Sequence, residues 1–380
     1  MILIQLIMFI FAVWSVVVFV SALIPKRLTR SAKHFHPEQI VVLVPAHNEE
    51  KVIGRLIENV TSNINGYPVR LIICADRCTD NTVPICKRND VEVFERKTGL
   101  PGKQYLLKDV FASLTKEYGS NPNVIVTILD ADNKIEPDYF EQLVDSLQED
   151  DVVQGYIATL NSSDNLQTRW YAMNYHFMLR YYYSGRERLN RSSILGGTGW
   201  GFRLSILERV PFDVTSVTDD LEYSAMLRLA KIRVKYNPLM RIYDEKPQSV
   251  RVGIRQRTRW ARGQWQVFFQ YFPKLVFKDF EFCMYLALPL FMLIGLFGFW
   301  FNNNAILNLI FSVIFILFWM AMDRGLSELP GLLLHIPYLI IQNVIMVYAL
   351  FTFKNNSWVR TPHGTANVKY GEKVKPVSLD

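Results

Sequence analysis

Two carboxylates one residue apart follow an apolar run in the middle of the chain. The run Val124–Leu129 leads directly into Asp130 and Asp132. Val, Ile, Thr and Leu in an unbroken run are typical of a buried strand. In an extended chain, side chains two apart point to the same side, ~6.5 Å apart. Where such a strand ends, both acids can bind one Mg²⁺ or Mn²⁺ and bridge it to substrate phosphates. The same short pattern also fits a polar loop after a core strand, so the rest of the chain must decide.

Strands and helices alternate around this pair. We expect further strands at Ile40–Val44, Val69–Cys74 and Val91–Phe94, and helices over 51–60 and 104–114. This alternation predicts a parallel, three-layer α/β sheet. Ligands of such sheets bind beyond the carboxyl ends of the strands, where the polar loops 48–49, 76–80 and 130–132 follow. Neither a Gly-x-Gly-x-x-Gly nor a Walker pattern occurs, so a dinucleotide-binding fold and a P-loop kinase are not supported.

A second acidic segment, Thr218-Asp219-Asp220, precedes residues with a helical period. Thr218 or Asp219 could therefore cap a helix. Capping does not exclude chemistry, because a carboxylate near a hydroxyl can also take its proton.

A basic amphipathic helix is predicted beyond residue 250. Gln256, Arg259, Trp260 and Gly263 fall at i, i+3, i+4 and i+7, on one helix face. Such a helix can lie on the cytoplasmic face of a membrane. Arginine also suits a diphosphate, because its guanidinium donates two parallel hydrogen bonds.

Two segments between these motifs have alternative interpretations. The aromatic stretch 170–183 is typical of a helix that packs on the sheet or at a membrane interface. It could instead form a platform for acceptor sugar rings. The glycine-rich segment 196–201 allows close approach of backbone to a ligand, but it could also be only a tight turn.

The ends of the chain hold most of the excess apolar residues. Residues 2–24 carry no formal charge and are followed by four basic residues, Lys26, Arg27, Arg30 and Lys33. A helix of that length is ~34 Å, enough for a ~30 Å hydrocarbon core. The basic residues predict that the middle of the chain is cytoplasmic. Later apolar segments lie at Phe282–Phe301, Ala305–Met322 and Gly331–Phe353, of which the last is the candidate for an interfacial or re-entrant helix.

Composition excludes several classes of function. The chain has 380 residues, half of them hydrophobic, with a net charge of +7. The positive charge lies after the first apolar segment and around 251–262, which indicates lipid headgroups or phosphorylated substrates rather than nucleic acid. The four cysteines lack the paired spacing of a zinc site.

Together these motifs, over residues ~38–265, resemble the inverting family 2 glycosyltransferases with a GT-A fold. The nearest branch is the membrane-embedded polysaccharide synthases, which make cellulose, hyaluronan, chitin or poly-N-acetylglucosamine. The resemblance implies that Asn48, Glu49 and Asp76 hold the nucleoside and that Lys103 lies near the nucleotide. By the same resemblance, Asp130 and Asp132 bind the metal and the diphosphate.

The resemblance also implies an acceptor side. The glycine-rich segment would contact the acceptor through Gly197, Thr198 and Gly199. The general base would be Asp220, with Asp219 in place of the family's usual Glu. Gln-x-x-Arg-Trp is the most specific element, and it implies that Gln256 and Arg259 bind the donor diphosphate while Trp260 stacks near the acceptor sugar. The segment Trp358–Gly364 resembles the family's cytoplasmic gating segment.

The sequence therefore predicts an α/β GT-A domain between one N-terminal transmembrane helix and a C-terminal helical membrane region. The expected parts are a transmembrane helix at 1–25, a cytoplasmic catalytic domain at 38–245, an interface helix region at 246–275, transmembrane or re-entrant helices at 281–353, and a cytoplasmic tail or gating segment at 354–380. The expected activity is Mg²⁺- or Mn²⁺-dependent transfer from a UDP-sugar to a growing polysaccharide at the plasma membrane, with export. The alternatives are a transferase that adds one sugar to a lipid carrier or lipid, and a transporter whose α/β domain senses nucleotide. The transporter is disfavoured because no acidic residue marks an ion path in the centres of the apolar segments.

Overall fold

A computed structural model of the chain describes residues 2–24, 35–287 and 333–355. Its centre is an eight-stranded sheet in the order β3-β2-β1-β4-β7-β6-β8-β5. The first four strands are those that the sequence predicts: β1 (Gln39–Ala46), β2 (Val69–Asp76), β3 (Glu92–Arg96) and β4 (Val124–Ile128). They are mutually parallel, with β1 between β2 and β4. This part of the prediction is confirmed.

The second half of the sheet is mixed, so the expectation of a wholly parallel sheet is wrong. Its strands are β5 (Lys134–Ile135), β6 (Val152–Thr159), β7 (Trp200–Arg203) and β8 (Val234–Asp244). β7 runs antiparallel to both β4 and β6, and β5 runs antiparallel to β8. Helices separate β6 from β7, yet this pair is antiparallel, so strand–helix alternation alone does not fix the direction of a strand.

Helices cover both faces of the sheet. Ile40, Val42 and Val44 of β1 belong to one hydrophobic core, whereas Val41 and Leu43 belong to the other. This alternation follows from the two-residue period of a strand, and burial on both faces explains the continuous apolar run. The helices of these layers are α2 (Ile53–Ser62), α3 (Thr82–Arg88), α4 (Lys103–Tyr118), α5 (Tyr139–Ser146), α8 (Ile206–Arg209) and α9 (Asp219–Leu229).

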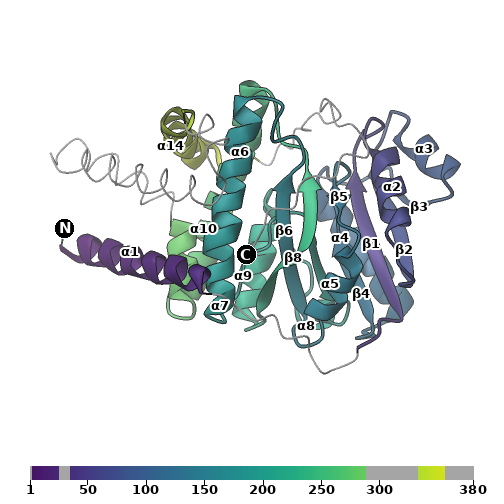
Figure 1. Cartoon of the computed structure of the whole chain (residues 1–380), viewed down its shortest axis with the longest axis horizontal. Coiled ribbons are helices and arrows are strands. Elements are labelled where there is room, and N and C mark those ends of the chain that lie inside the picture. The colour runs from purple at the N-terminus through teal and green to yellow at the C-terminus, as the bar shows by residue number, and fades with distance from the viewer. Residues whose placement is uncertain (1, 25–34, 288–332, 356–380) are drawn as a thin grey trace.

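A group of helices lies beside the β6–β8 side of the sheet (Figure 1). It consists of α1 (Ile2–Leu23), α6 (Leu166–Phe177), the π-helix η1 (Met178–Tyr183), α7 (Ser184–Arg188), α10 (Val250–Leu275) and α14 (His335–Thr352). α1 packs on α7 at Gly185, where an added Cβ would lie 1.9 Å from the carbonyl oxygen of Val18. Phe19 stacks on Tyr181 with ring centroids 4.7 Å apart. α1 is therefore attached to the domain along one face, and it extends away from the sheet.

Among the helices within residues 2–24, 35–287 and 333–355, none combines the length and apolar composition that a membrane crossing requires. Within the segment predicted to be a transmembrane helix, residues Ile2–Leu23 form α1, which buries Val18 and Ala22 against the domain. The predicted segments Phe282–Phe301 and Ala305–Met322 lie largely or wholly outside the described residues, as does Trp358–Gly364. Within Gly331–Phe353, α14 packs against α10, where the indole nitrogen of Trp265 donates to the carbonyl oxygen of Met346 at 3.1 Å.

Candidate functional site

One cavity of about 610 Å³ lies at the carboxyl ends of the central strands. Its lining includes most of the residues that the sequence singles out: Glu49, Asp76, Lys103, Asp130, Asp132, Gly197, Thr198, Asp220, Gln256, Arg259 and Trp260. Asn48 and Gly199 are not among the lining residues. Loops separated by more than 100 residues in sequence therefore meet at one site, as expected for the carboxyl edge of an α/β sheet.

The end of β2 is fixed by two arginines. Asp76 accepts hydrogen bonds from Arg96 at 3.0 Å and from Arg77 at 2.8 Å. Arg96 is buried, and its guanidinium also donates to the carbonyl oxygen of Leu100 at 2.9 Å. It thereby joins β2 to the loop that leads into α4. Sequence reasoning missed Arg96, although it lies two residues after the predicted third strand, where ligand-site residues are expected.

The loop after β1 is joined to the loop after β2. Asn48 has a left-handed backbone (φ 59°), and its side-chain oxygen accepts from the backbone N–H of Thr79 at 2.7 Å. The backbone N–H of Glu49 donates to the hydroxyl of Thr82 at 2.8 Å. Asn48 therefore connects the two loops behind the cavity, whereas Glu49 lines it.

Lys103 links the loop after β4 to the glycine-rich segment. Its ammonium donates to Asp130 at 2.6 Å and to the carbonyl oxygen of Gly197 at 2.7 Å. Burial acts to lower the lysine pKa, but the nearby carboxylates of Asp130, Asp219 and Asp220 outweigh burial, and the pKa is raised. Lys103 is therefore a charged group at neutral pH, placed among the acidic residues of the site.

The glycine-rich segment is hydrogen-bonded to the loop that carries Asp130. Gly197 and Gly199 both have positive φ, at 84° and 63°. The hydroxyl of Thr198, between them, accepts from the backbone N–H of Asp130 at 3.0 Å and donates to Asn133. Gly199 packs under Ile242, whose side chain would lie 2.9 Å from an added Cβ. Of the three residues predicted to contact acceptor, Gly197 and Thr198 line the cavity and Gly199 does not.

Asp130 and Asp132 have the chemistry of a divalent-cation site. Asp132 accepts from the backbone N–H of Glu245 at 3.1 Å and from the side chain of Asn133 at 3.2 Å, which orient its carboxylate. Within the described part of the chain, no three or more His, Cys, Asp or Glu side chains are grouped to hold a metal. Two carboxylates are nevertheless sufficient for Mg²⁺ or Mn²⁺ that takes its other oxygens from water and substrate phosphates. The residues therefore fit a cation that binds together with a diphosphate.

Two adjacent aspartates, the buried Asp219 and the partly buried Asp220, begin α9. Burial, and next the neighbouring carboxylate of Asp219, raises the pKa of Asp220 to about 7. Burial also raises the pKa of Asp219. Thr218 occupies the N-cap position, but its side chain makes no capping hydrogen bond. A carboxylate with a pKa near 7 can accept a proton from a substrate hydroxyl at neutral pH.

α10 brings an arginine to these aspartates. An added Cβ at Gly263 would lie 2.3 Å from the hydroxyl oxygen of Thr218, so α10 approaches the start of α9 closely. One turn earlier, Arg259 donates to the carbonyl oxygen of Val217 at 3.2 Å. Burial lowers the pKa of Arg259, while Asp219 and Asp220 act in the opposite direction. The helix face predicted from Gln-x-x-Arg-Trp thus lines the cavity.

Part of the aromatic stretch packs as predicted rather than facing a ligand. Trp170 stacks on Tyr338 of α14 with ring centroids 3.9 Å apart, and the Arg257 guanidinium lies 4.5 Å from the centroid of Trp170. Tyr175 and Tyr183, by contrast, line the cavity. The stretch therefore contributes both to helix packing and to the cavity wall, and a platform for acceptor sugar rings stays a prediction.

The sequence reasoning also missed Asp244, Glu245 and Lys246, which line the cavity where β8 ends. The ammonium of Lys246 donates to Asp244 Oδ2 at 2.6 Å and lies 3.3 Å from the ring centroid of Tyr175. The strand-end rule that identifies Asp76 and Asp130 applies equally to β8. A strand predicted at Val234–Asp244 would place these three residues at a strand end.

The family described as "Glycosyltransferase like family 2" matches residues 37–263 of the chain. This range contains the whole sheet and the cavity residues up to Trp260.

Three curated relatives are about one quarter identical to the chain. The "Probable glycosyltransferase YdaM" of Bacillus subtilis is 25% identical over 59% of this chain and 55% of its own length. The "Beta-monoglucosyldiacylglycerol synthase" of Synechocystis is 26% identical over 65% of this chain and 52% of its own. The "Poly-beta-1,6-N-acetyl-D-glucosamine synthase" of Staphylococcus aureus is 25% identical over 60% and 55%. The chain thus spans about half the length of these relatives.

Among solved structures, the mannosyltransferase PcManGT from Pyrobaculum calidifontis, in complex with GDP-Man and Mn²⁺, aligns with a TM-score of 0.59. It is 16% identical, and the alignment covers 89% of this chain and 94% of that one. At this identity the likeness concerns the fold.

Proposed function

The chain belongs to glycosyltransferase family 2, and from that premise we propose that it transfers a sugar from a nucleotide sugar to an acceptor hydroxyl with inversion of the anomeric carbon. The observation that carries the proposal is the meeting of Asp76, Asp132, Asp220 and Arg259 in one cavity. These residues supply nucleoside recognition, diphosphate binding and a proton acceptor. Inverting transfer needs all three at a single site.

The reaction is a single displacement. Asp220 accepts the proton of the acceptor hydroxyl, whose oxygen attacks the anomeric carbon opposite the diphosphate. The bond from that carbon to the diphosphate oxygen breaks, and the diphosphate leaves with the electron pair. Lys103 and Arg259 place positive charge beside it, which offsets the negative charge that develops. Mg²⁺ or Mn²⁺ held by Asp130 and Asp132 would supply further charge stabilisation to the leaving group.

The donor is a UDP-sugar, with glucose or N-acetylglucosamine preferred, and the acceptor is a growing polysaccharide. The poly-N-acetylglucosamine synthase relative and the Gln-x-x-Arg-Trp segment on α10 support this acceptor. Processive addition with export of the polymer is part of the same proposal.

A lipid acceptor is the second candidate. A relative named for synthesis of a glucosyldiacylglycerol supports it, and so do apolar side chains exposed on α14, among them Ile340, Val344 and Phe351. Such side chains could contact an acyl chain while the headgroup hydroxyl enters the cavity.

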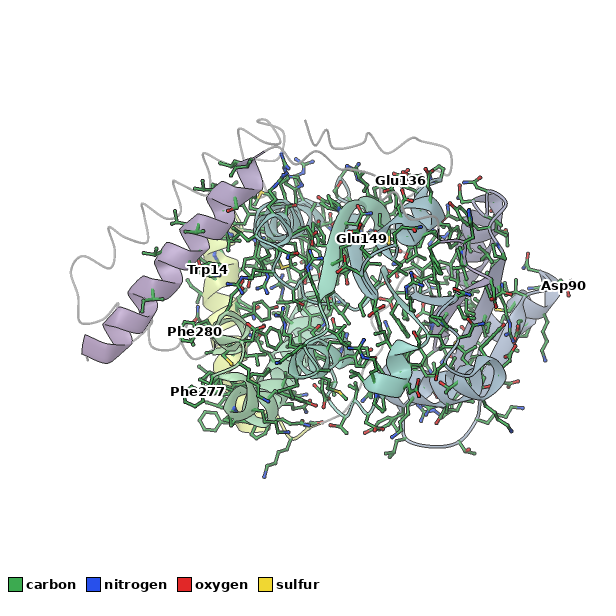
Figure 2. The ribbon with its side chains drawn as sticks, turned by 90° about the horizontal axis from the view of Figure 1, so that it is seen from below. Trp14, Asp90, Glu136, Glu149, Phe277 and Phe280 are labelled. Atoms are coloured by element: carbon green, nitrogen blue, oxygen red, sulfur yellow. The ribbon has the colours of Figure 1, made fainter. Side chains whose placement is uncertain are left out.

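The proposed location is the cytoplasmic face of the plasma membrane. Val16 and Val20 of α1 are at least half exposed, and Phe277 after α10 is 98% exposed. In Figure 2, Phe277 and Phe280 lie on the same side of the molecule as Trp14 of α1, far from Asp90. Apolar side chains gathered on one side favour contact with lipid.

The test is to incubate the purified chain with Mn²⁺, a panel of UDP-sugars and GDP-mannose, and either oligosaccharide or diacylglycerol acceptors. We expect nucleoside diphosphate release with one UDP-sugar. Long products on a gel would support the polysaccharide synthase, and a single glycolipid product would support the lipid transferase. Absence of release with every donor would contradict the proposed function.

A further inference from the structure

Two buried acceptor oxygens in the cavity have no hydrogen-bond donor in the described part of the chain. They are Asp244 Oδ1, at the end of β8, and Gln256 Oε1, on α10. A buried polar atom without a partner costs free energy, and such atoms are rare in folded proteins. Both residues line the cavity, so a molecule bound there is a candidate donor to these two oxygens.

Asp244 is held in one orientation by its neighbours. Its other oxygen, Oδ2, accepts from Lys246 at 2.6 Å. Lys246 is only 3% exposed, and Asn161 bonds both its backbone N–H, at 2.8 Å, and its carbonyl oxygen, at 2.9 Å. The ring of Tyr175 covers its ammonium group. Because the backbone and the ammonium of Lys246 are both held, Asp244 is oriented through Oδ2, and Oδ1 is left without a donor among the described residues.

The position of Asp244 indicates which part of a substrate it meets. The next residue, Glu245, donates its backbone N–H to Asp132 at 3.1 Å. Burial raises the pKa of Asp244 to about 6, with Lys246 lowering it and the nearby carboxylate of Asp132 raising it further. Asp244 therefore lies beside the carboxylate that we assign to the diphosphate. The group attached to that diphosphate is the sugar to be transferred.

We propose that Asp244 determines donor-sugar specificity by accepting a hydrogen bond, through Oδ1, from a hydroxyl of the transferred sugar. Gln256 Oε1 accepts from a second donor on the same ligand. This inference rests on the proposed function, and it adds the recognition of the sugar itself to that of the nucleotide. A donor that lacks the matching hydroxyl leaves a buried carboxylate oxygen unpaired, and such sites discriminate strongly.

The experiment measures binding of UDP and of the active UDP-sugar, both with Mn²⁺, by calorimetry. The test variant is Asp244→Leu combined with Lys246→Gln, which removes both charges and the acceptor oxygens of residue 244 while keeping similar volumes. Lys246→Gln alone is the matched control, because it retains Asp244. We expect the double variant to bind UDP-sugar about tenfold more weakly than the control, with UDP affinity changed by less than about twofold. Thermal unfolding of both variants reports whether they are folded.

Donors that each lack one sugar hydroxyl give a second measurement, made on both the wild type and the double variant. One deletion should weaken binding about tenfold in the wild type and have little effect in the double variant. Equal loss of UDP and UDP-sugar affinity in the double variant would overturn the inference, because Asp244 would then act on the cation or the diphosphate. So would equal tolerance of every hydroxyl deletion by the wild type. Failure of the wild type to bind any nucleotide sugar would instead contradict the proposed function.

Discussion

The carboxylates on two walls of the cavity differ in how their charges are paired. We call these the nucleotide wall and the reaction wall, after the roles proposed above. On the nucleotide wall, at the ends of β1 and β2, Asp76 is held by Arg96 and Arg77 within 3.0 Å. On the reaction wall, where α9 begins, the buried Asp219 lies next to the partly buried Asp220, and the pKa of each is raised. One wall has its charges paired, whereas the other keeps like charges together.

This difference indicates that the two walls have different roles in the proposed reaction. A carboxylate fixed by arginines is oriented in advance, so it can recognise a nucleoside with little loss of conformational entropy. A carboxylate that burial and a like charge make more basic can accept a proton during the reaction. We therefore expect changes on the nucleotide wall to alter donor binding, and changes on the reaction wall to alter turnover.

The sharpest test of this division is Asp220→Asn, which keeps the shape of the side chain and removes its basicity. We expect kcat to fall about 10³-fold, because general-base catalysis typically contributes 10²- to 10⁴-fold. The dissociation constant for UDP should stay within about twofold. Steady-state turnover and calorimetric UDP binding, measured on the same preparation, separate the two effects.

Asp213→Asn is the matched control for this change. Asp213 lies a few residues before α9, and its side chain is 63% exposed and paired with Lys108. We expect turnover to stay at the wild-type level, since exposed pairs of this kind contribute little. Wild-type turnover in Asp220→Asn would show that the proton acceptor lies elsewhere.

Removal of divalent cations tests the boundary between the walls, where Asp130 and Asp132 lie. EDTA should reduce turnover about 10²-fold or more, because the leaving diphosphate loses a neutralising charge. Added Mn²⁺ or Mg²⁺ should restore it, and Ca²⁺ serves as the comparison. Undiminished release of nucleoside diphosphate in EDTA would remove the cation from the mechanism.

Arg96→Gln should produce the pattern expected of the nucleotide wall. Loss of its contacts to Asp76 and Leu100 loosens the loop that leads to Lys103. We expect the KM for donor to rise about tenfold, kcat to change little, and the free energy of unfolding to fall by about 3 kcal/mol, since Arg96 belongs to a buried ion pair. Kinetics at several donor concentrations and urea unfolding measure these effects.

Arg70→Gln is the control for Arg96→Gln. Arg70 starts the neighbouring strand β2 and pairs with the exposed carboxylates of Glu92 and Glu117. Its removal should leave both kinetic constants near wild type. A fall in kcat for Arg96→Gln, with unchanged KM, would contradict the division between the walls.

The sequence predicted the carboxylates that end the early strands better than the one that ends β8, for a physical reason. Asp76 and Asp130 each follow an apolar run, so the rule that ligands bind at strand ends places them without knowledge of the tertiary fold. Asp244 also ends a strand, but β8 alternates apolar with polar residues and contains Pro238. A strand of this kind gives a weak pattern, and its carboxylate was missed.

Packing between distant elements could not be predicted from local pattern. Gly263 allows α10 to approach Thr218, and that contact places Arg259 beside Asp219. Nothing in the sequence near residue 263 indicates its partner 45 residues earlier. The antiparallel entry of β7 is similar, because it depends on which edge of β4 remains open after β1 pairs with its other edge. The resemblance to a known family associated Arg259 with Asp220 where periodicity could not, but it did not predict the antiparallel β7.

The smallest expected effect concerns the coupling within the reaction wall. Asp220 must be ionised to accept a proton, so kcat/KM should rise with pH below about 7 and reach a plateau above it. Asp219→Asn removes the like charge that, after burial, raises the pKa of Asp220. The midpoint of the profile should therefore move to lower pH, and the plateau rate should fall modestly because the base is weaker. A midpoint that moved upward, or stayed in place, would mean that the titrating group is not Asp220 or that the two carboxylates are not coupled. A downward shift would instead show that the charge of Asp219, in addition to burial, raises the pKa of Asp220.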